Sequence, residues 1–347
     1  MKRVKLSDVA TAAGVSSATV SLVLSENANG RVSEKVEKRV RAEAKRLKYS
    51  PNLAARSLRT QKSKTIGLIS DTVATTNFAG RMLAGAEETA WKRGWLLIFV
   101  DTSSDSKNEE LAISALIQRD VEGFIYASMS HRKLDCPPQL KTRPTIFLHC
   151  SVNSPDALSS VVPAEYSSAA LAMDYLIKNG HREIGWLGIT NPTVSGQERA
   201  RAYLDAMKQM KVKAVRSLIS NTFESYAEDG YISAMKLLSS KRRPTALFCF
   251  SDRMAMGAYR AAAELGLRVP DDISIMGFDN QPHIAEALWP PLSTIQLPHY
   301  EMGTWAATRL IDELEKKDSE QISPEQKEII CQLVERGSVA PYHPGIG

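Results

Sequence analysis

The stretch Leu6–Leu24, LSDVATAAGVSSATVSLVL, reads as two short helices separated at Gly14. Gly14 allows the left-handed backbone of a tight turn, and Ser16 stands where a side-chain oxygen can cap the second helix. Apolar side chains recur at helical spacing on one face of each helix, namely Val9, Ala10 and Ala13, then Val20, Val23 and Leu24. The pattern predicts a helix-turn-helix, whose second helix enters the major groove of DNA. The alternative is an ordinary pair of surface helices.

The distribution of charge favours the DNA-binding interpretation. The whole chain of 347 residues has a formal net charge of +5. Residues 1–64 hold 15 Lys and Arg against 5 Asp and Glu, a net of +10, whereas the rest of the chain holds 29 against 34, a net of −5. A basic end on a mildly acidic body is typical of a protein that places one end on a polyanion.

Composition sets the broad class of the protein. Hydrophobic residues make up 43% and charged residues 24%, which is ordinary for a soluble chain of two or three domains. No apolar run approaches the roughly 18 residues that span a bilayer, and no signal core follows the basic N-terminus, so a cytoplasmic location is expected. The cysteines are far apart, which indicates buried free thiols rather than a disulfide or a metal site.

A third helix is predicted after Val32, with Ser33 as its cap and a basic outer face. Its apolar side chains share one face: Val36, Val40, Ala44 and Leu47. The next segment, PNLAARSLRT from Pro51, has the proline and preceding serine of a helix start, but too little apolar surface to fold alone. It is either a frayed linker or a helix that forms only against a partner.

From Thr65 onward, buried-strand patterns alternate with helical ones. The predicted strands are residues 65–71, 95–102, 123–128, 145–151, 159–164, 183–189, 215–220, 246–252, 273–279 and 292–298. The predicted helices lie near 78–93, 107–119, 132–141, 166–179, 196–210, 225–239, 253–265 and 299–317. Repeated β-α units form parallel sheets with right-handed crossovers. Because the strands are too many for one compact sheet, we expect two α/β lobes with a ligand site between them, beyond the carboxyl ends of the strands.

These motifs resemble the lactose-repressor/galactose-repressor (LacI/GalR) family of bacterial transcription regulators over essentially the whole chain. The resemblance is carried by DVATAAGVSSATVSLVL, RVSEKV, KYSPNLAARSLRT and KTIGLI, then by NGHREIGWLG, RPTALFCFSDRMAMGAYRAAAELGLRVPDDISIMGFDN and PPLSTI. It implies a repressor that binds a pseudo-palindromic DNA operator as a homodimer or a dimer of dimers, with DNA affinity controlled by a small molecule. The tail after Gln332 has no leucine heptad repeat, which favours a dimer.

The resemblance also implies the domain organisation. Residues 1–50 form the three-helix DNA-binding head, and residues 51–64 form a hinge helix and linker. Residues 65–347 form a two-lobed, periplasmic-binding-protein-like α/β core for effector binding and dimerisation. The N-lobe is expected at about 65–160 plus 292–325, and the C-lobe at about 161–291 plus 326–342.

The resemblance assigns DNA contacts to both the head and the hinge. Family positions that face base edges fall on Ser17, Ala18 and Leu22, which offer one hydroxyl and apolar contacts to thymine methyl groups. Direct base readout should therefore be modest. Leu58 corresponds to the hinge leucine that wedges into the minor groove beside its two-fold mate and kinks the duplex. The remaining DNA-binding candidates, expected at phosphates or in a groove, are Ser16, Thr19, Ser21, Asn52, Ala55 and Arg56.

Effector-binding residues are implied at strand ends and helix starts. Arg199, in SGQERARAYLDAM, matches a family arginine that binds sugars or effector carboxylates, and Asp279, in MGFDN, matches an acid that accepts hydrogen bonds from hydroxyls. The other candidates are Asn77, Phe78, Asp101, His149 and Trp289, with Phe223 or Tyr226 as an aromatic wall. An arginine, acids and flat apolar faces suit polyhydroxylated rings, so a sugar or sugar derivative is the expected effector.

Structural alternatives and departures from the family stay open. The structural alternatives are Asp279 as a turn cap, Phe78 as a core residue, Arg199 in a surface pair with Glu198 or Asp205, and His149 as a satisfied structural histidine. Pro163-Ala164 replace a pair that is usually Asp-Asn, and Ser251 stands where asparagine commonly precedes Asp252. These departures leave room for a non-sugar effector such as a nucleobase, for a protein corepressor, or for no effector.

Other classes of protein fit the sequence poorly. A periplasmic sugar-binding protein would carry a signal peptide and no basic helix-turn-helix head. An enzyme is not expected, because no G-x-S-x-G motif, metal-ligand cluster or phosphate-cradling glycine loop occurs. The sequence therefore predicts a regulator whose partners are double-stranded operator DNA, a small molecule and a second copy of the chain, with no cofactor, no metal and no membrane.

Overall fold

The chain forms two compact units, a head of residues Met1–Ser63 and a core of residues Lys64–Gly347. This structure is a computed structural model that describes residues 4–24, 31–49, 62–73, 80–153, 158–317 and 323–342. Several predicted site residues lie outside the described residues, namely Asn52, Ala55, Arg56 and Leu58 of the hinge and Asn77 and Phe78 of the core.

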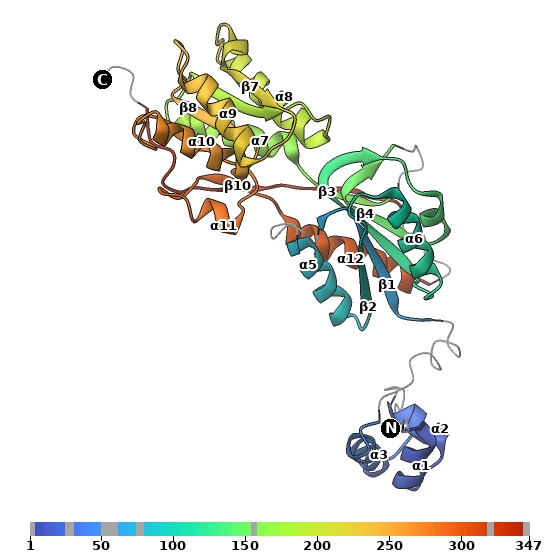
Figure 1. Cartoon of the computed structure of the whole chain (residues 1–347). Coiled ribbons are helices and arrows are strands. Elements are labelled where there is room, and N and C mark those ends of the chain that lie inside the picture. Colours follow the sequence, from blue (N-terminus) through green and yellow to red (C-terminus); the bar gives the residue numbers. More distant parts are fainter. Residues whose placement is uncertain are drawn as a thin grey trace. The chain divides into compact units, whose positions relative to one another are not determined.

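The head consists of the helices α1 (Leu6–Ala13), α2 (Ser17–Leu24) and α3 (Glu34–Arg46) (Figure 1). The axes of α1 and α2 meet at 103°, and Gly14 between them has a φ of 64°. This is the geometry of a helix-turn-helix, so the predicted turn at Gly14 is confirmed. The core of the head is made of fully buried valines, Val9, Val20, Val23 and Val40.

Within the described ranges, no single helix is long and apolar enough to cross a membrane. The bent pair α1 and α2 passes the test of length and composition when the two helices are taken together. Val9, Ala13, Val20 and Val23 of this pair are buried in the core of the head.

The first lobe is built on a parallel sheet with the strand order β11-β5-β4-β3-β1-β2. Its strands are β1 (Thr65–Ser70), β2 (Leu96–Asp101), β3 (Gly123–Leu134), β4 (Thr145–Val152), β5 (Ser160–Pro163) and β11 (Gln326–Ile329). Ile66 and Leu68 pack on one face against α5 (Gly80–Lys92) and α12 (His299–Glu315). Ile69 packs on the other face against α6 (Ser106–Ile117). Buried strands with helices on both faces are what the continuous apolar runs predict.

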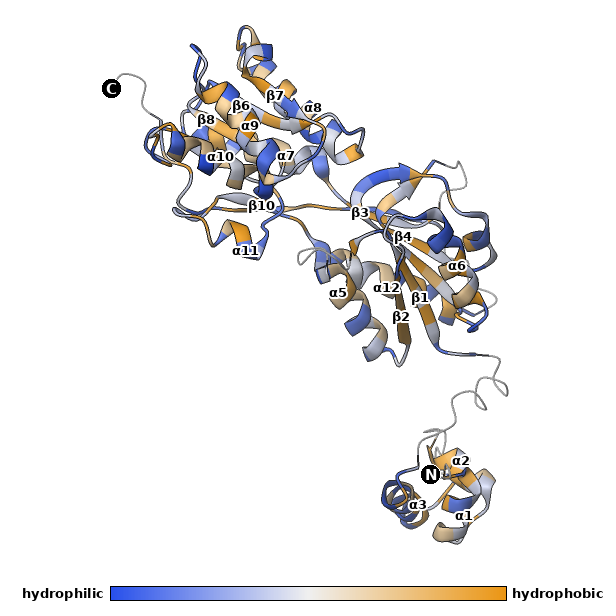
Figure 2. Cartoon of the chain, in the orientation of Figure 1, coloured by the Kyte–Doolittle hydropathy of each residue, from blue (hydrophilic) through white to orange (hydrophobic). Residues whose placement is uncertain are grey.

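The second lobe repeats this plan with the strand order β7-β6-β8-β9. Its strands are β6 (Ile184–Ile189), β7 (Ile219–Thr222), β8 (Ala246–Cys249) and β9 (Ser274–Met276). Its helices are α7 (Glu165–Lys178), α8 (Val194–Gln209), α9 (Ala227–Leu238), α10 (Asp252–Glu264) and the short α11 (Pro282–Ala285). Inner strands such as β1 and β8 carry hydrophobic colouring, whereas the end of β3 and many outer turns of the helices are hydrophilic (Figure 2). The core of the lobe includes Trp186, whose ring stacks on Tyr203 at a centroid distance of 5.7 Å.

The chain passes between the lobes at several points. It crosses after β5, after the short strand β10 (Thr294–Gln296), and again between β11 and β12 (Gln332–Val334), which pairs antiparallel with β10. The expected assignment of residues 326–342 to the second lobe is therefore wrong for β11, which joins β5 at the edge of the first sheet. The first lobe also extends through Pro163 rather than ending at 160, and residues 292–297, expected in the first lobe, pack in the core of the second. Because β11 is a largely exposed edge strand of sequence QKEI, it lacks the apolar pattern of a buried strand.

The helix predicted near 132–141 is also wrong. β3 continues to Leu134, and the residues after it form only a short 3₁₀ helix, η2 (Pro138–Thr142). Pro137 and Pro138 explain the difference, because proline restricts the residue before it to extended backbone and cannot donate a helical hydrogen bond.

The contact between α5 and α12 leads to a stability prediction. A Cβ added at Gly85 of α5 would overlap the carbonyl oxygen of Tyr300, whereas a Cβ added at Gly80 meets nothing within 4 Å. Gly85→Ala should therefore lower the free energy of unfolding by about 1 to 3 kcal/mol through overpacking. Gly80→Ala in the same helix is the control and should be neutral or stabilising by up to about 1 kcal/mol. Urea unfolding of both variants provides the measurement, and equal stabilities would contradict the close helix approach.

Candidate functional site

The recognition surface of the head is small and weakly polar. Ser17 and Ala18 are exposed on α2, and Leu22 is half-buried. The Oγ of Ser16 accepts a hydrogen bond from the Thr19 backbone N–H at 3.1 Å, so Ser16 caps α2 as predicted. Ser21 is half-buried on the same helix. These side chains offer hydroxyls and methyl groups, rather than long donors, to a DNA groove.

Exposed cations cover the outer face of α3. The exposed basic residues are Lys35, Lys38, Arg39, Arg41, Lys45 and Arg46. Lys38 pairs with Glu34 at 2.7 Å, but both side chains are more than three-quarters exposed, so the pair is weak. The helix thus keeps a positive surface that suits phosphate contacts.

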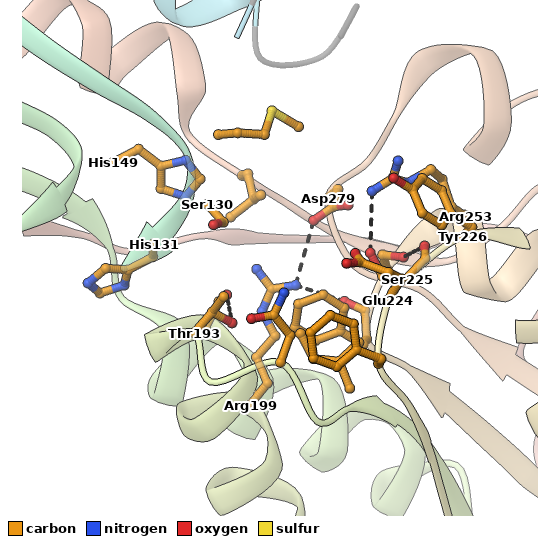
Figure 3. Close-up of a pocket in the computed structure, with 18 of the residues that line it drawn as sticks. Ser130, His131, His149, Thr193, Arg199, Glu224, Ser225, Tyr226, Arg253 and Asp279 are labelled. Atoms are coloured by element: carbon orange, nitrogen blue, oxygen red, sulfur yellow. Dashed lines mark hydrogen bonds and ion pairs between the residues drawn. The ribbon is translucent and has the colours of Figure 1, made fainter. Parts of the chain in front are cut away.

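The core contains a cavity of about 450 Å³ that residues of both lobes line. It lies beyond the carboxyl ends of the parallel strands, where the topology predicts a ligand. Figure 3 shows Ser130, His131 and His149 on one side, Ser225, Tyr226 and Arg253 on the other, and Arg199 and Asp279 between them. Of the residues predicted from the sequence, the structure brings together His149, Arg199, Phe223, Tyr226 and Asp279.

Arg199 is the buried centre of this cavity. Its side chain is 4% exposed, and its Nε donates to the Glu165 Oε2 at 2.7 Å. Its Nη1 donates to the Phe250 carbonyl oxygen at 2.7 Å and lies 3.6 Å from the Asp279 Oδ1. The guanidinium also stacks on the ring of Phe278 at 3.6 Å. Burial opposes the charge, but Glu165 and Asp279 outweigh it and raise the pKa of Arg199. The alternative of a surface pair is therefore wrong.

Asp279 provides an acceptor beside the guanidinium. Its backbone has a φ of 111°, a conformation that side-chain-bearing residues rarely adopt. Its Oδ2 accepts a hydrogen bond from the Gln281 Nε2 at 2.9 Å. Burial raises the pKa of Asp279 to about 6, although Arg199 favours the ionised form. A carboxyl with this pKa can accept a hydrogen bond from a ligand at neutral pH.

Three buried histidines, His131, His149 and His299, stand on the first-lobe side. The rings of His149 and His299 meet edge to face at a centroid distance of 5.5 Å. Burial lowers the pKa of His131 to about 4, that of His299 to about 3, and that of His149 well below its ordinary value. All three are therefore neutral at pH 7. Among the described residues, no group of three or more His, Cys, Asp and Glu side chains is arranged to hold a metal ion.

Aromatic rings form the wall that belongs to the second lobe. Phe223 and Tyr226 follow β7, and their side chains are 64% and 56% exposed. Both residues line the cavity, so the aromatic wall that the sequence assigned to one or the other contains both. The Arg253 guanidinium lies 5.1 Å from the ring centroid of Tyr226. Exposed rings beside buried polar groups give a flat apolar surface on which a planar ligand can stack.

Two predicted effector residues do not line the cavity. Asp101 ends β2, the edge strand of the first sheet, and its Oδ1 accepts from the Ser103 backbone N–H at 2.9 Å. Asp101 thus stabilises a local turn. It does not reach the cavity, because β2 is the edge strand of the sheet. Trp289 is 88% exposed in the loop after α11 and is absent from the cavity lining in the part of the chain that the structure describes.

Other cavity residues were not predicted. Asn191, Thr193 and Ser195 follow β6 and open α8, so the rule that ligands lie beyond strand ends would have indicated them. Arg253 follows Asp252 directly in the motif SDR. Ser130 and His131 carry no such signal, because their position depends on an irregularity of β3 that the apolar pattern does not reveal.

Comparison with known proteins agrees with this architecture. Residues 5–52 match the family described as bacterial regulatory proteins, lacI family, and residues 173–339 match a periplasmic binding protein-like domain. The HTH-type transcriptional repressor PurR of Pectobacterium carotovorum subsp. carotovorum (strain PC1) is 34% identical to this chain. The alignment of 349 positions covers 97% of this chain and 98% of the relative.

Solved structures show the same fold. The lac repressor dimer bound to operator and the anti-inducer ONPF is 25% identical, with a TM-score of 0.77 over 98% of this chain and 100% of that one. The transcriptional regulator CelR in complex with cellobiose is 25% identical, with a TM-score of 0.67 over 97% of this chain and 100% of that one. The helical head and the two-lobed core therefore form a shared architecture.

The buried histidines lead to a prediction for acid stability. His131 has a pKa of about 4 in the fold against an ordinary 6.5, so the unfolded chain binds one more proton between these pH values. The free energy of unfolding should fall as the pH drops from 6.5 towards 4, by about 1.4 kcal/mol per pH unit for this histidine. His131→Gln should reduce the slope by this amount and leave the contributions of His149 and His299, whereas the same change at exposed His283 should leave the slope unchanged. Urea unfolding at pH 7.5, 6.0 and 5.0 measures the slopes, and identical slopes for wild type and His131→Gln would refute the prediction.

Proposed function

The chain belongs to the lacI family of bacterial regulatory proteins and is a DNA-binding transcriptional repressor, and on this premise we propose how it is controlled. It binds a pseudo-palindromic operator as a homodimer in the cytoplasm, and an effector in the cavity of the core changes its affinity for DNA. The observation that supports this proposal is the cavity, which combines buried polar groups with exposed aromatic rings as small-molecule sites do.

The head supports an operator-binding role with modest direct readout. Ser17, Ala18 and Leu22 provide hydroxyl and methyl contacts, and the basic face of α3 provides charge. Specificity then depends largely on DNA bending at the hinge, where Leu58 is the proposed wedge. Two heads related by a two-fold axis read two half-sites.

We favour a nucleobase over a sugar as the effector. Phe223 and Tyr226 offer ring faces for stacking, and Arg199 and Asp279 offer a donor and an acceptor beside them. Neutral imidazoles on the opposite wall add groups that both donate and accept. A planar heterocycle has two apolar faces and a polar edge, which this arrangement matches.

The sugar interpretation has weaker support. The family pair Asp-Asn is replaced by Pro163 and Ala164, both buried, and the Ser251 hydroxyl caps α10 by accepting from the Met254 N–H at 3.3 Å. Polar groups that would bind hydroxyls are thus missing or engaged at these positions. CelR, the similar regulator whose solved structure contains cellobiose, shares only 25% of its residues with this chain, so it gives the sugar interpretation little support. A protein corepressor remains the third candidate in the test below.

A ligand panel with matched variants tests the effector class. We expect adenine, guanine, hypoxanthine, xanthine, cytosine and uracil to include at least one base that raises the melting temperature of the full-length protein and changes its operator affinity. Glucose, galactose, ribose and cellobiose should leave both unchanged. Phe223→Ala should weaken base binding by about 10-fold or more, since stacking on an aromatic ring is worth about 1 to 3 kcal/mol.

Trp289→Ala is the control for this experiment. It removes an aromatic side chain that is even more exposed than Phe223 but does not line the cavity, so base binding should be unchanged. Asp279→Asn, which keeps the size of the side chain, should also weaken binding. A response to a sugar alone would establish the sugar interpretation, and no response to either class would favour a protein corepressor.

The proposed wedge makes a separate prediction about DNA. Leu58→Ala should lower affinity for an operator fragment by about 10-fold or more, because the kink that the leucine stabilises is lost. Affinity for unrelated DNA should change less than about 3-fold, because it rests on phosphate contacts. Ser57→Ala, in the same segment, is the control. Fluorescence anisotropy at one fixed salt concentration gives both affinities, and an equal loss on both DNAs would contradict the wedge.

A further inference from the structure

β3 is interrupted where it reaches the cavity. Its pairing with β4 is regular as far as Ala127 opposite Leu148 and resumes with Arg132 opposite Cys150. Over this interval β3 advances five positions while β4 advances two, so residues 128–131 form a bulge. Bulges of this kind redirect side chains and often lie beside functional sites. The bulge presents Met129, Ser130 and His131 to the cavity.

β4 is irregular at the same level. His149, between Leu148 and Cys150, has a φ of 60°, in the left-handed region that favours glycine. This backbone turns the buried imidazole into the cavity wall (Figure 3). Among the described residues neither ring nitrogen has a partner with good hydrogen-bond geometry, although the Ser128 backbone is near enough to raise the pKa of the imidazole and so oppose the effect of burial. The two strands thus depart from regular geometry together, and both departures supply cavity side chains.

A single carboxylate holds the bulge in place. Asp71, directly after β1, accepts through Oδ2 from the Ser128 Oγ at 2.9 Å and from the Arg132 Nη2 at 3.1 Å. Its Oδ1 accepts from the backbone N–H groups of Met129 at 2.9 Å and Thr72 at 2.6 Å. The side chain of Asp71 is 9% exposed and does not line the cavity. Asp71 therefore holds both ends of the bulge by hydrogen bonds without contacting the cavity itself.

We propose that Asp71 is a positioning residue for effector selection. It fixes the bulge of residues 128–131 so that Ser130 and His131, together with His149, form a hydrogen-bonding wall that decides which effector the cavity accepts. This inference rests on the proposed function, because it requires an effector in the cavity.

The chemistry of the wall indicates what it selects. Its imidazoles are neutral at pH 7, so each offers one donor and one acceptor, and the Ser130 hydroxyl offers both. The His131 Nδ1 is buried without a hydrogen-bond partner in the described parts of the chain and lies 4.0 Å from the Glu165 Oε1, too far for a hydrogen bond. Such a wall favours an uncharged edge with donors and acceptors, such as the amide edge of a base, over a carboxylate or phosphate.

Asp71→Asn tests the positioning role in the full-length protein. The substitution keeps the shape of the side chain but removes its charge and one acceptor oxygen. Asp101→Asn is the matched control, because Asp101 ends the neighbouring strand and does not line the cavity. Hydrogen exchange of peptides that cover residues 128–132 should be at least 10-fold faster in Asp71→Asn and unchanged in Asp101→Asn. Operator affinity without effector should stay within about 2-fold for both variants.

The second measurement is selectivity. The bases of the panel are titrated into both variants, and the ratio of the dissociation constants of the best and second-best base is compared with wild type. Asp71→Asn should reduce this ratio at least 5-fold, whereas a merely stabilising role would lower the melting temperature and keep the ratio. Ser128→Ala, which removes one of the hydrogen bonds, should give an intermediate result if Asp71→Asn does not fold.

The outcomes separate the two proposals. Unchanged exchange and an unchanged ratio in Asp71→Asn overturn the positioning role. Absence of base binding by the wild type overturns the nucleobase proposal, and with it the selectivity of the wall. In that case, the exchange measurement alone decides whether Asp71 holds the bulge.

Discussion

The cavity depends on a pair of opposite charges that are buried together. Glu165 and Arg199 are 1% and 4% exposed, and neither can return to water while the fold persists. Removing an ion from water costs several kcal/mol, so the loss of either partner would leave an uncompensated charge in the interior. Glu165 opens α7 directly after β5, where the chain leaves the first sheet, and Arg199 belongs to the second lobe. The ion pair therefore fixes a guanidinium at the junction of the lobes, and Asp279 and the aromatic rings are arranged around it.

This arrangement gives an effector two different surfaces to contact. The first lobe contributes neutral imidazoles and a serine hydroxyl, and the second contributes a cation, a carboxyl and exposed rings. A ligand shifts a conformational equilibrium only by the difference in its affinity for the two states. A molecule that bridges both surfaces favours the arrangement of the lobes in which both contacts are made.

The sequence predicts what depends on local pattern and misses what depends on contacts between distant residues. The apolar runs predict the buried parallel strands, whereas β11, an exposed edge strand of polar residues, has no such pattern. Arg199 and Asp279 were predicted because the motifs around them, SGQERARAYLDAM and MGFDN, resemble those of the LacI/GalR family. Glu165 and Asp71 were not, because their roles appear only when β1, β3 and α8 come together. Trp289 was expected to contact the effector but is not among the described residues that line the cavity, since an aromatic residue beside prolines marks a loop but not the direction in which its side chain lies.

The discontinuity of the first lobe has a consequence for how the protein is made. The sheet of the second lobe, β7-β6-β8-β9, is complete once residue 276 has been synthesised. The first sheet still lacks β11, and α5 still lacks α12, until the ribosome has added residues 299–329. The first lobe, although it is translated first, therefore keeps apolar surface uncovered until α12 and β11 have been made, and the second lobe receives β12 and Ser338 last of all. Transiently exposed apolar surface of this kind is what makes chaperones necessary during synthesis.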